Sequence, residues 1–115
     1  MQLVVAIIQP TKLSTVRDAL NEIGISHLTV CDALGYGRQH GQKQHFRGNE
    51  YRIDLLRKIT IEIVVSNEQL QPCIDTIRRS AITGSEGQIG DGKLFVMPIA
   101  EVIDLATGNQ GQTAI

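Results

Sequence analysis

The chain has no tryptophan, and its 115 residues include only two tyrosines and two phenylalanines. An aromatic cluster is therefore excluded, and the core must be built from aliphatic side chains. No apolar run approaches the ~20 residues that a membrane-spanning helix needs. The apolar opening segment, residues 1–8, is too short for a signal peptide and is soon followed by Pro10. We therefore expect a cytoplasmic protein.

Cysteine is also scarce. Cys31 and Cys73 form no Cys-x-x-Cys pair, and neither has a histidine at ligand spacing. We expect two buried thiols in a reducing compartment. His40 and His45 lie five residues apart without an acidic or cysteine partner, which is a weak pattern for a metal site.

No excess of one charge is present, because 12 acidic residues face 11 basic ones. This balance argues against nucleic acid as a partner, and a hydrophobic content of 42% argues against disorder. The basic residues are nevertheless uneven, since six of the 11 lie in residues 36–58. A segment this long between two strands is generally functional, and its charge suits docking into a partner protein. A solvated loop without a task is the alternative.

Hydrophobic periodicity predicts strands and helices in alternation. The third strand alternates most clearly, with Ile59, Ile61 and Ile63 on one face. Thr11 is a candidate cap for the first helix, and Ser66 or Asn67 for the second. The expected elements are strands at residues 3–8, 25–35, 58–65 and 94–97, helices at 12–23 and 67–82, and a short edge strand at 101–105.

The order β-α-β-β-α-β predicts an α+β protein with the ferredoxin-like plan, formed by a single domain over residues 1–115. Both helices then cover one face of the sheet. We place Val4 and Val64 on the other face, which makes that face apolar too. A bare apolar sheet face indicates assembly with further copies.

A glycine-rich stretch precedes the last main strand and ends in Gly90-Asp91-Gly92-Lys93. Glycines let backbone N–H groups approach phosphate oxygens, and a lysine adds a positive charge. The P-loop pattern is absent. Phosphate binding and a simple turn are both compatible with this stretch.

Taken together, the chain resembles the PII signal-transduction family along nearly its whole length. The matching segments are Ile7-Ile8, Pro10, Lys12-Leu13, Gly35-Tyr36-Gly37-Arg38-Gln39, Arg47-Gly48, Glu50-Tyr51, Leu56, Lys58, Ile61-Glu62-Ile63-Val64-Val65, Gly90-Asp91-Gly92-Lys93-Leu94-Phe95-Val96 and Thr107-Gly108. They occur in the order of the family, with its spacing except at one insertion.

The resemblance implies a homotrimer that binds ATP or ADP between subunits and that regulates without being an enzyme; we find no catalytic residues. The implied nucleotide-binding residues are Thr29, Gly35, Gly37, Arg38, Gln39, Glu62, Val64, Gly90, Asp91, Gly92 and Lys93. It also implies that 2-oxoglutarate binds beside Mg-ATP, with Gln39 holding the Mg²⁺ and Lys58 meeting a carboxylate.

Three segments of the family have counterparts here: a T-loop at about residues 37–57, a glycine-rich B-loop at about 83–93 and a C-terminal tail at about 107–115. In the family the T-loop binds targets such as ammonium transporters and enzymes of nitrogen assimilation. Tyr51 matches a position that some relatives uridylylate. An exposed tyrosine that only contacts partners is the alternative.

The chain departs from the family at several positions. Asp104 and Ala106 stand where relatives carry two phosphate-binding arginines, Gln9 replaces a basic residue, and residues 85–87 lengthen the B-loop. The loss of two cations predicts weaker binding of ATP and a shift towards ADP or AMP. The alternative function is a PII-like regulator of another transport or metabolic pathway, with a changed ligand.

Overall fold

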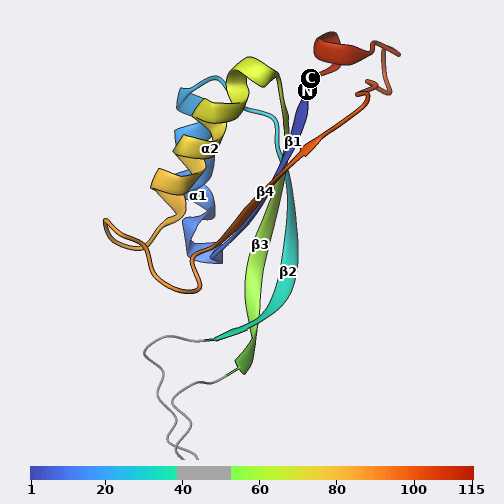
Figure 1. Ribbon diagram of the computed structural model, residues 1–115. Coiled ribbons are helices and arrows are strands. Elements are labelled where there is room, and N and C mark those ends of the chain that lie inside the picture. Colours follow the sequence, from blue (N-terminus) through green and yellow to red (C-terminus); the bar gives the residue numbers. More distant parts are fainter. Residues whose placement is uncertain (39–52) are drawn as a thin grey trace, which may run out of the picture.

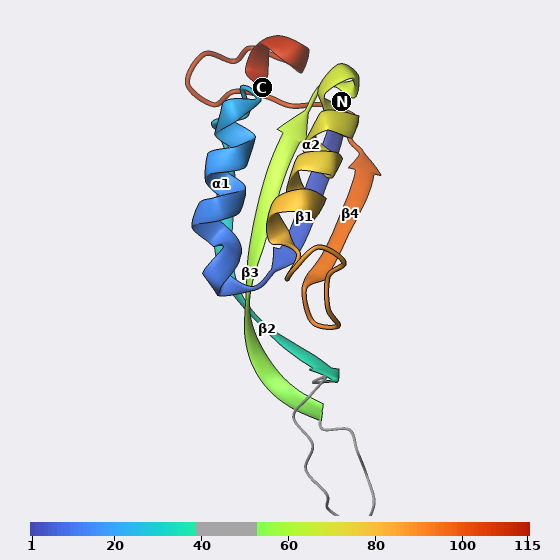
Figure 2. The same cartoon turned by 90° about the vertical axis from the view of Figure 1, so that its left-hand side faces the viewer.

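The computed structural model describes the backbone of residues 1–38 and 53–115, and the side chains of residues 1–36 and 55–115 (Figure 1). Its elements, in chain order, are β1 (Gln2–Ile8), the 3-10 helix η1 (Pro10–Lys12), α1 (Leu13–Glu22), β2 (Thr29–Arg38), β3 (Ile53–Val65), α2 (Asn67–Ala81), β4 (Gly92–Pro98) and the 3-10 helix η2 (Gly111–Ala114). The strands pair antiparallel in the order β2-β3-β1-β4. Both helices lie on one face of this sheet (Figure 2). The expected α+β ferredoxin-like plan is thereby confirmed.

The core lies between the helices and the sheet. Val16 and Leu20 of α1 and Cys73 and Ile77 of α2 are buried against the sheet. From β3 the buried residues are Ile59, Ile61, Ile63 and Val65, as their alternation predicted. All of these apolar side chains except Cys73 are aliphatic, in agreement with the shortage of aromatic residues.

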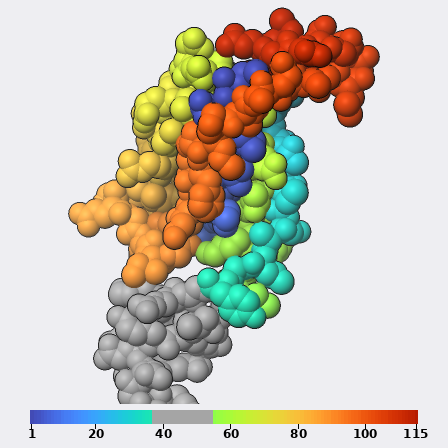
Figure 3. Space-filling view, turned by 45° about the vertical axis from the view of Figure 1, so that its right-hand side comes forward, coloured from blue at the N-terminus to red at the C-terminus, as the bar shows by residue number. Residues whose placement is uncertain are grey.

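One placement on the sheet was wrong. Val4 is fully buried and pairs with Ile63, so it belongs to the helix-covered face. The opposite face, called the open face below, carries the intervening residues of each strand. Its apolar members include Leu3, Val5, Ile7, Val64, Phe95 and Met97. Phe95 and Met97 are 46% and 41% exposed. Figure 3 shows the four strands of the sheet side by side from this direction.

Helix ends agree with the sequence in part. Ser66 caps α2 and accepts a hydrogen bond from the Gln69 N–H at 3.3 Å. Thr11 caps nothing, because α1 begins after η1 with Lys12 at its N-cap and no side-chain cap. Gly24 follows the α1 C-cap with φ 87°, a conformation that favours glycine.

The second strand lies further along the chain than predicted. Residues 25–28 form a connection, and Ile25 is buried in the core instead of joining the sheet. β2 and β3 then extend the hairpin beyond the helices (Figure 2). Residues 37–38 and 53–57 of the expected T-loop are therefore strand, and the remainder lies outside the described residues.

The expected edge strand at residues 101–105 is absent from the described structure. Only an isolated bridge joins Ile103 to Gln110, and the chain then ends in η2. The whole segment after β4, residues 99–115, is called the tail below. It begins beside the N-terminus, where the Ile99 N–H donates to the Met1 carbonyl at 3.3 Å. No helix in the described ranges is long and apolar enough to cross a membrane.

The two cysteines differ. Cys73 is fully buried, and burial raises the pKa of its thiol to about 11. The expectation that Cys31 is buried was wrong for this single subunit, because Cys31 is exposed and free. It pairs with Thr60, on the open face that no helix covers.

Candidate functional site

One group of the implied nucleotide-binding residues lies where β2 begins and β3 ends. Thr29 pairs with Glu62, and Val64 follows on the same face of β3. These three residues help to line a cavity of about 360 Å³. Its other wall is the C-terminal segment, from Val102, Ala114 and Ile115. We call this cavity the upper cleft.

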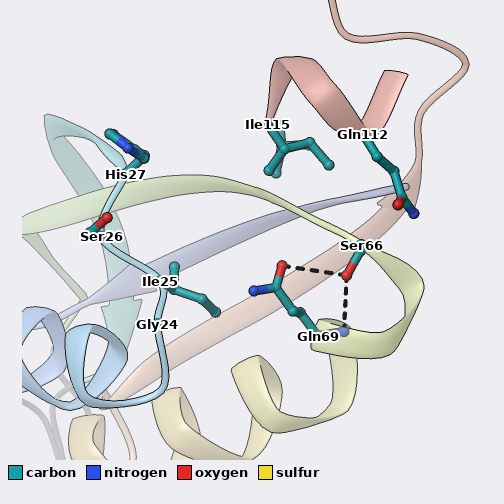
Figure 4. Close-up of a pocket in the computed structure, with 9 residues that line it drawn as sticks. Gly24, Ile25, Ser26, His27, Ser66, Gln69, Gln112 and Ile115 are labelled. Carbon is teal, nitrogen blue, oxygen red and sulfur yellow. Dashed lines mark hydrogen bonds between the residues drawn. The ribbon is translucent and has the colours of Figure 1, made fainter. Parts of the chain in front are cut away.

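A second cavity, of about 330 Å³, adjoins the upper cleft and shares Ser26, His27, Val64 and Ile115 with it. Figure 4 shows it between the connection after α1, the start of α2 and the tail. Its lining combines polar and apolar side chains and contains no lysine or arginine. Gln112 and Ile115 contribute to it, so the tail forms part of the wall of this cavity.

The tail is held in shape by two carboxylates. Glu101 Oε1 accepts the N–H groups of Val102 at 3.1 Å and Gly111 at 2.8 Å. Asp104 Oδ1 accepts those of Ala106 at 2.9 Å and Thr107 at 3.0 Å. These bonds, from Thr107 first and then Ala106, lower the pKa of Asp104 below its ordinary value.

Asp104 is thus the capping residue of a tight turn, closed by the Gly108 N–H on its own carbonyl at 2.8 Å. The sequence alone showed Asp104 only as a position where relatives carry a phosphate-binding arginine. The pattern Asp-x-x-Thr-Gly is a turn signal that could have revealed this role.

A second group of the implied residues lies in the B-loop, between α2 and β4. Asp91 organises this loop, because its carboxylate accepts the Thr83 N–H at 2.9 Å, the Thr83 hydroxyl at 2.6 Å and the Gln88 N–H at 2.7 Å. Partial burial alone would raise the pKa of Asp91. The hydrogen bonds from Thr83 and Gln88, together with the charge of Lys12, outweigh burial and lower it.

The B-loop is also tied to the sheet. Lys58 Nζ, on the open face of β3, donates to the Gly90 carbonyl at 2.7 Å. Gln9 Nε2 donates to Asp91 Oδ1 at 3.1 Å and reaches the Gly90 carbonyl at 3.5 Å. Lys58, Gln9, Gly90 and Asp91 therefore form one polar cluster at the lower end of the sheet. Sequence reasoning named these residues without linking them.

Gly92 is required by close packing. Its φ is 127°, and a Cβ atom there would overlap the carbonyl oxygen of Ile7. The next residue, Lys93, pairs with Ile7 and so places its side chain on the open face. The glycine therefore lets β4 start against β1 and sets the position of Lys93.

The upper cleft and the B-loop lie at opposite edges of the sheet. Thr29 is on the edge strand β2, and Gly92 opens the edge strand β4. Three strand spacings, or ~14 Å, separate β2 from β4. Thr29 lies in register with Phe95 of β4, and Gly92 is three residues, or ~10 Å, further along that strand. The two groups are therefore about 17 Å apart along the same sheet.

Comparisons with known proteins agree with this architecture. The family model "Nitrogen regulatory protein P-II" matches residues 1–109. The chain is 48% identical to the nitrogen regulatory protein P-II of Klebsiella oxytoca and to P-II 1 of Escherichia coli K12, over all of both chains in each case. The chain belongs to the nitrogen regulatory protein P-II family.

A solved structure of the same family supports the fold. Arabidopsis thaliana PII bound to citrate superposes with a TM-score of 0.77 and 36% sequence identity, over 98% of this chain and 87% of that one. As a P-II protein, the chain is a signal-transduction regulator and not an enzyme. The family binds small-molecule effectors, and its members act on target proteins.

Three further implied residues lie in the hairpin of β2 and β3. Gly35 lies in β2 opposite Leu56, and Gly37 and Arg38 contribute backbone to the end of that strand. Gln39 and Tyr51 lie outside the described residues, as do His40 and His45.

Proposed function

We propose that this P-II protein assembles as a homotrimer and senses adenine nucleotides bound between neighbouring copies. The observation that carries the proposal is the placement of the implied residues at opposite edges of one sheet. Ligand sites are concave and enclose most of the ligand. The upper cleft and the open face of a single copy enclose only part of a ligand that spans both groups, so a second copy is needed to complete the site.

The open face supports this assembly. It exposes apolar side chains that a single copy leaves in water, including Phe95 and Met97. An edge-to-edge contact, in which β4 of one copy meets β2 of the next, is head-to-tail and closes into a ring when the rotation allows. Such a ring brings the B-loop of one copy to the upper cleft of its neighbour.

In this arrangement the base lies in the upper cleft, beside Thr29, Glu62 and Val64. The phosphates face the glycine-rich B-loop and Lys93, which supply backbone N–H groups and one positive charge. The role of Asp91 is to shape that loop, since its carboxylate already accepts hydrogen bonds from Thr83 and Gln88.

A second effector with a carboxylate, such as 2-oxoglutarate, would meet Lys58 through a charge-assisted hydrogen bond. The citrate-bound relative supports a site for a carboxylate in this family. The described residues contain no group of three or more acidic, histidine or cysteine side chains that could hold a metal. A Mg²⁺ ion would therefore depend mainly on phosphate and effector oxygens, with Gln39 as a protein ligand.

Nucleotide binding would be read out by target proteins through the T-loop. We place the protein in the cytoplasm, with a nitrogen-assimilation enzyme or an ammonium transporter as its target. Modification of Tyr51 in this loop is part of the same proposal.

A changed ligand preference is the second candidate function. No lysine or arginine follows Lys93 in the sequence. The tail thus offers the phosphates no cation, and Asp104 is committed to its turn. ADP or AMP, or the ligand of another pathway, would then be preferred over ATP.

Calorimetric titration of the trimer with ATP, ADP and AMP, each with and without Mg²⁺ and 2-oxoglutarate, tests both candidates. Nucleotide sensing predicts about one site per copy, lost in Lys93→Ala. The changed preference predicts that ATP gains over AMP when Asp104 and Ala106 are both replaced by arginine. Absence of binding by all three nucleotides contradicts the proposed function.

A further inference from the structure

The contact between Lys58 and the B-loop joins two places where ligands are proposed to bind. Lys58 lies on β3, next to the hairpin that leads into the T-loop, and its ammonium group donates to the Gly90 carbonyl at 2.7 Å. Charge-assisted hydrogen bonds of this kind are the strong ones in proteins. The position of the Lys58 ammonium group is therefore linked to the B-loop by a direct hydrogen bond.

The B-loop has a conformation that can be released. Its last turn closes through the Asp91 N–H on the Gln88 carbonyl at 3.1 Å, with Gly90 at φ 99°. This is the geometry of a type II turn, which requires a glycine at its third position. A glycine there can also take other conformations easily, so tertiary contacts must select one of them.

Three groups supply that selection. Lys58 and Gln9 both approach the Gly90 carbonyl, and Asp91 fastens the base of the loop through Thr83 and Gln88. Of these groups, only Lys58 is a cation that an incoming carboxylate would attract. The neutral amide of Gln9 cannot replace the lost charge.

We propose that the Lys58–Gly90 contact is a latch: a carboxylate effector draws Lys58 away from the Gly90 carbonyl and thereby loosens the B-loop. The effector carboxylate and the Gly90 carbonyl of the closed B-loop then compete for the same ammonium group. The inference rests on the proposed carboxylate role of Lys58. An ammonium group has three donors, so the opposite case, in which Lys58 holds both partners at once, is a clear alternative result.

The loop carries its own reporters. The N–H groups of Thr83, Gly87, Gln88 and Asp91 each donate to an acceptor within the B-loop. Amide hydrogen exchange, followed by NMR on the intact trimer, measures how often these bonds open. The amides of Gly24 and Ile25, hydrogen-bonded at the end of α1, serve as internal controls.

The first arm of the experiment needs no ligand. Lys58→Met keeps the length of the side chain and removes its charge and donors. The latch predicts that exchange at the four reporter amides rises roughly 10- to 100-fold, because one charge-assisted hydrogen bond no longer stabilises the closed loop. Arg57→Met is the matched control, because Arg57 is adjacent on β3 but is paired with Asp32 at 3.1 Å. Unchanged exchange in Lys58→Met overturns the latch whatever the protein binds.

The second arm adds citrate or 2-oxoglutarate to the unmodified protein and to Lys58→Met, both already saturated with Mg-ATP, and compares exchange with that of the Mg-ATP form alone. The latch predicts faster exchange in the unmodified protein and no further change in the variant. If Lys58→Met loosens the loop but neither carboxylate does, the contact is a structural tie and the switch is wrong. The first arm needs no nucleotide, so the Lys58–Gly90 contact and the proposed nucleotide binding can fail or stand separately.

Discussion

Three glycines allow the packing account to be tested as a graded series, in which the same change, glycine to alanine, meets three different surroundings. Gly35 has an ordinary φ, and a Cβ atom there would lie 3.6 Å from the side chain of Lys58. Gly90 has φ 99° but nothing within 4 Å of the added atom. Gly92 has φ 127°, and the added atom would overlap the Ile7 carbonyl oxygen and lie 2.9 Å from its carbonyl carbon.

The magnitudes follow from these surroundings. Gly35→Ala is expected to leave the free energy of unfolding unchanged or to raise it by up to ~1 kcal/mol, since alanine fits an ordinary strand conformation better than glycine does. Gly90→Ala is expected to cost ~1–2 kcal/mol, the strain of a positive φ. Gly92→Ala has the same positive-φ strain and also forces β4 away from the end of β1. It is therefore expected to lower the free energy of unfolding by roughly 3–5 kcal/mol.

Urea unfolding of the three variants, at one protein concentration because assembly contributes to stability, measures the series. The slope of the transition should stay constant while its midpoint falls in the order Gly35, Gly90, Gly92. Equal costs for Gly90→Ala and Gly92→Ala would refute the close approach of β4 to Ile7.

Three further results are expected. Asp91→Asn should lower the free energy of unfolding by about 1–2 kcal/mol near pH 7. Because folding lowers the pKa of Asp91, this loss should persist above the ordinary pKa of 3.8 and vanish as pH falls through the folded pKa. A loss that stays constant over the whole pH range would contradict the role given to the Asp91 carboxylate. Ser66→Ala should cost ~1 kcal/mol in urea unfolding by removing the side-chain cap of α2. No change would show that the Ser66 carbonyl, which also accepts the Gln69 N–H at 3.1 Å, is a sufficient acceptor. A thiol reagent applied to the separated subunit should label Cys31 at once and Cys73 only on unfolding, whereas equal rates would contradict the burial of Cys73.

Much of the fold was within reach of the sequence, because its evidence is local. The alternation at Ile59, Ile61 and Ile63 identified the buried face of β3, and Ser66 was a correct candidate for the cap of α2. The boundaries of β2 were not within reach. Ile25 has the residue type of a strand, but its side chain is used to fill the core beside α1. Only the tertiary packing decides between these two uses.

The candidate site was likewise predictable only in part. The B-loop glycines and Lys93 could be named from their pattern, but the contact from Lys58 to Gly90 joins residues 32 positions apart and depends on the register of the sheet. Val4 was misplaced for a related reason. In a continuous apolar strand both faces look alike, and the sequence carries no alternation to tell them apart.

The central claim is that the nucleotide site is formed by two copies, and a mixing experiment tests it most directly. One variant loses the upper cleft contacts (Thr29→Ala with Glu62→Ala), and the other loses the B-loop cation (Lys93→Ala). Each homotrimer alone should fail to bind nucleotide. After the two are unfolded together in equal amounts and refolded, about one quarter of the seams should pair two intact halves, and binding should return at that level. If the mixed trimers bind no more nucleotide than the separate variants, each site lies within a single copy and the account is wrong.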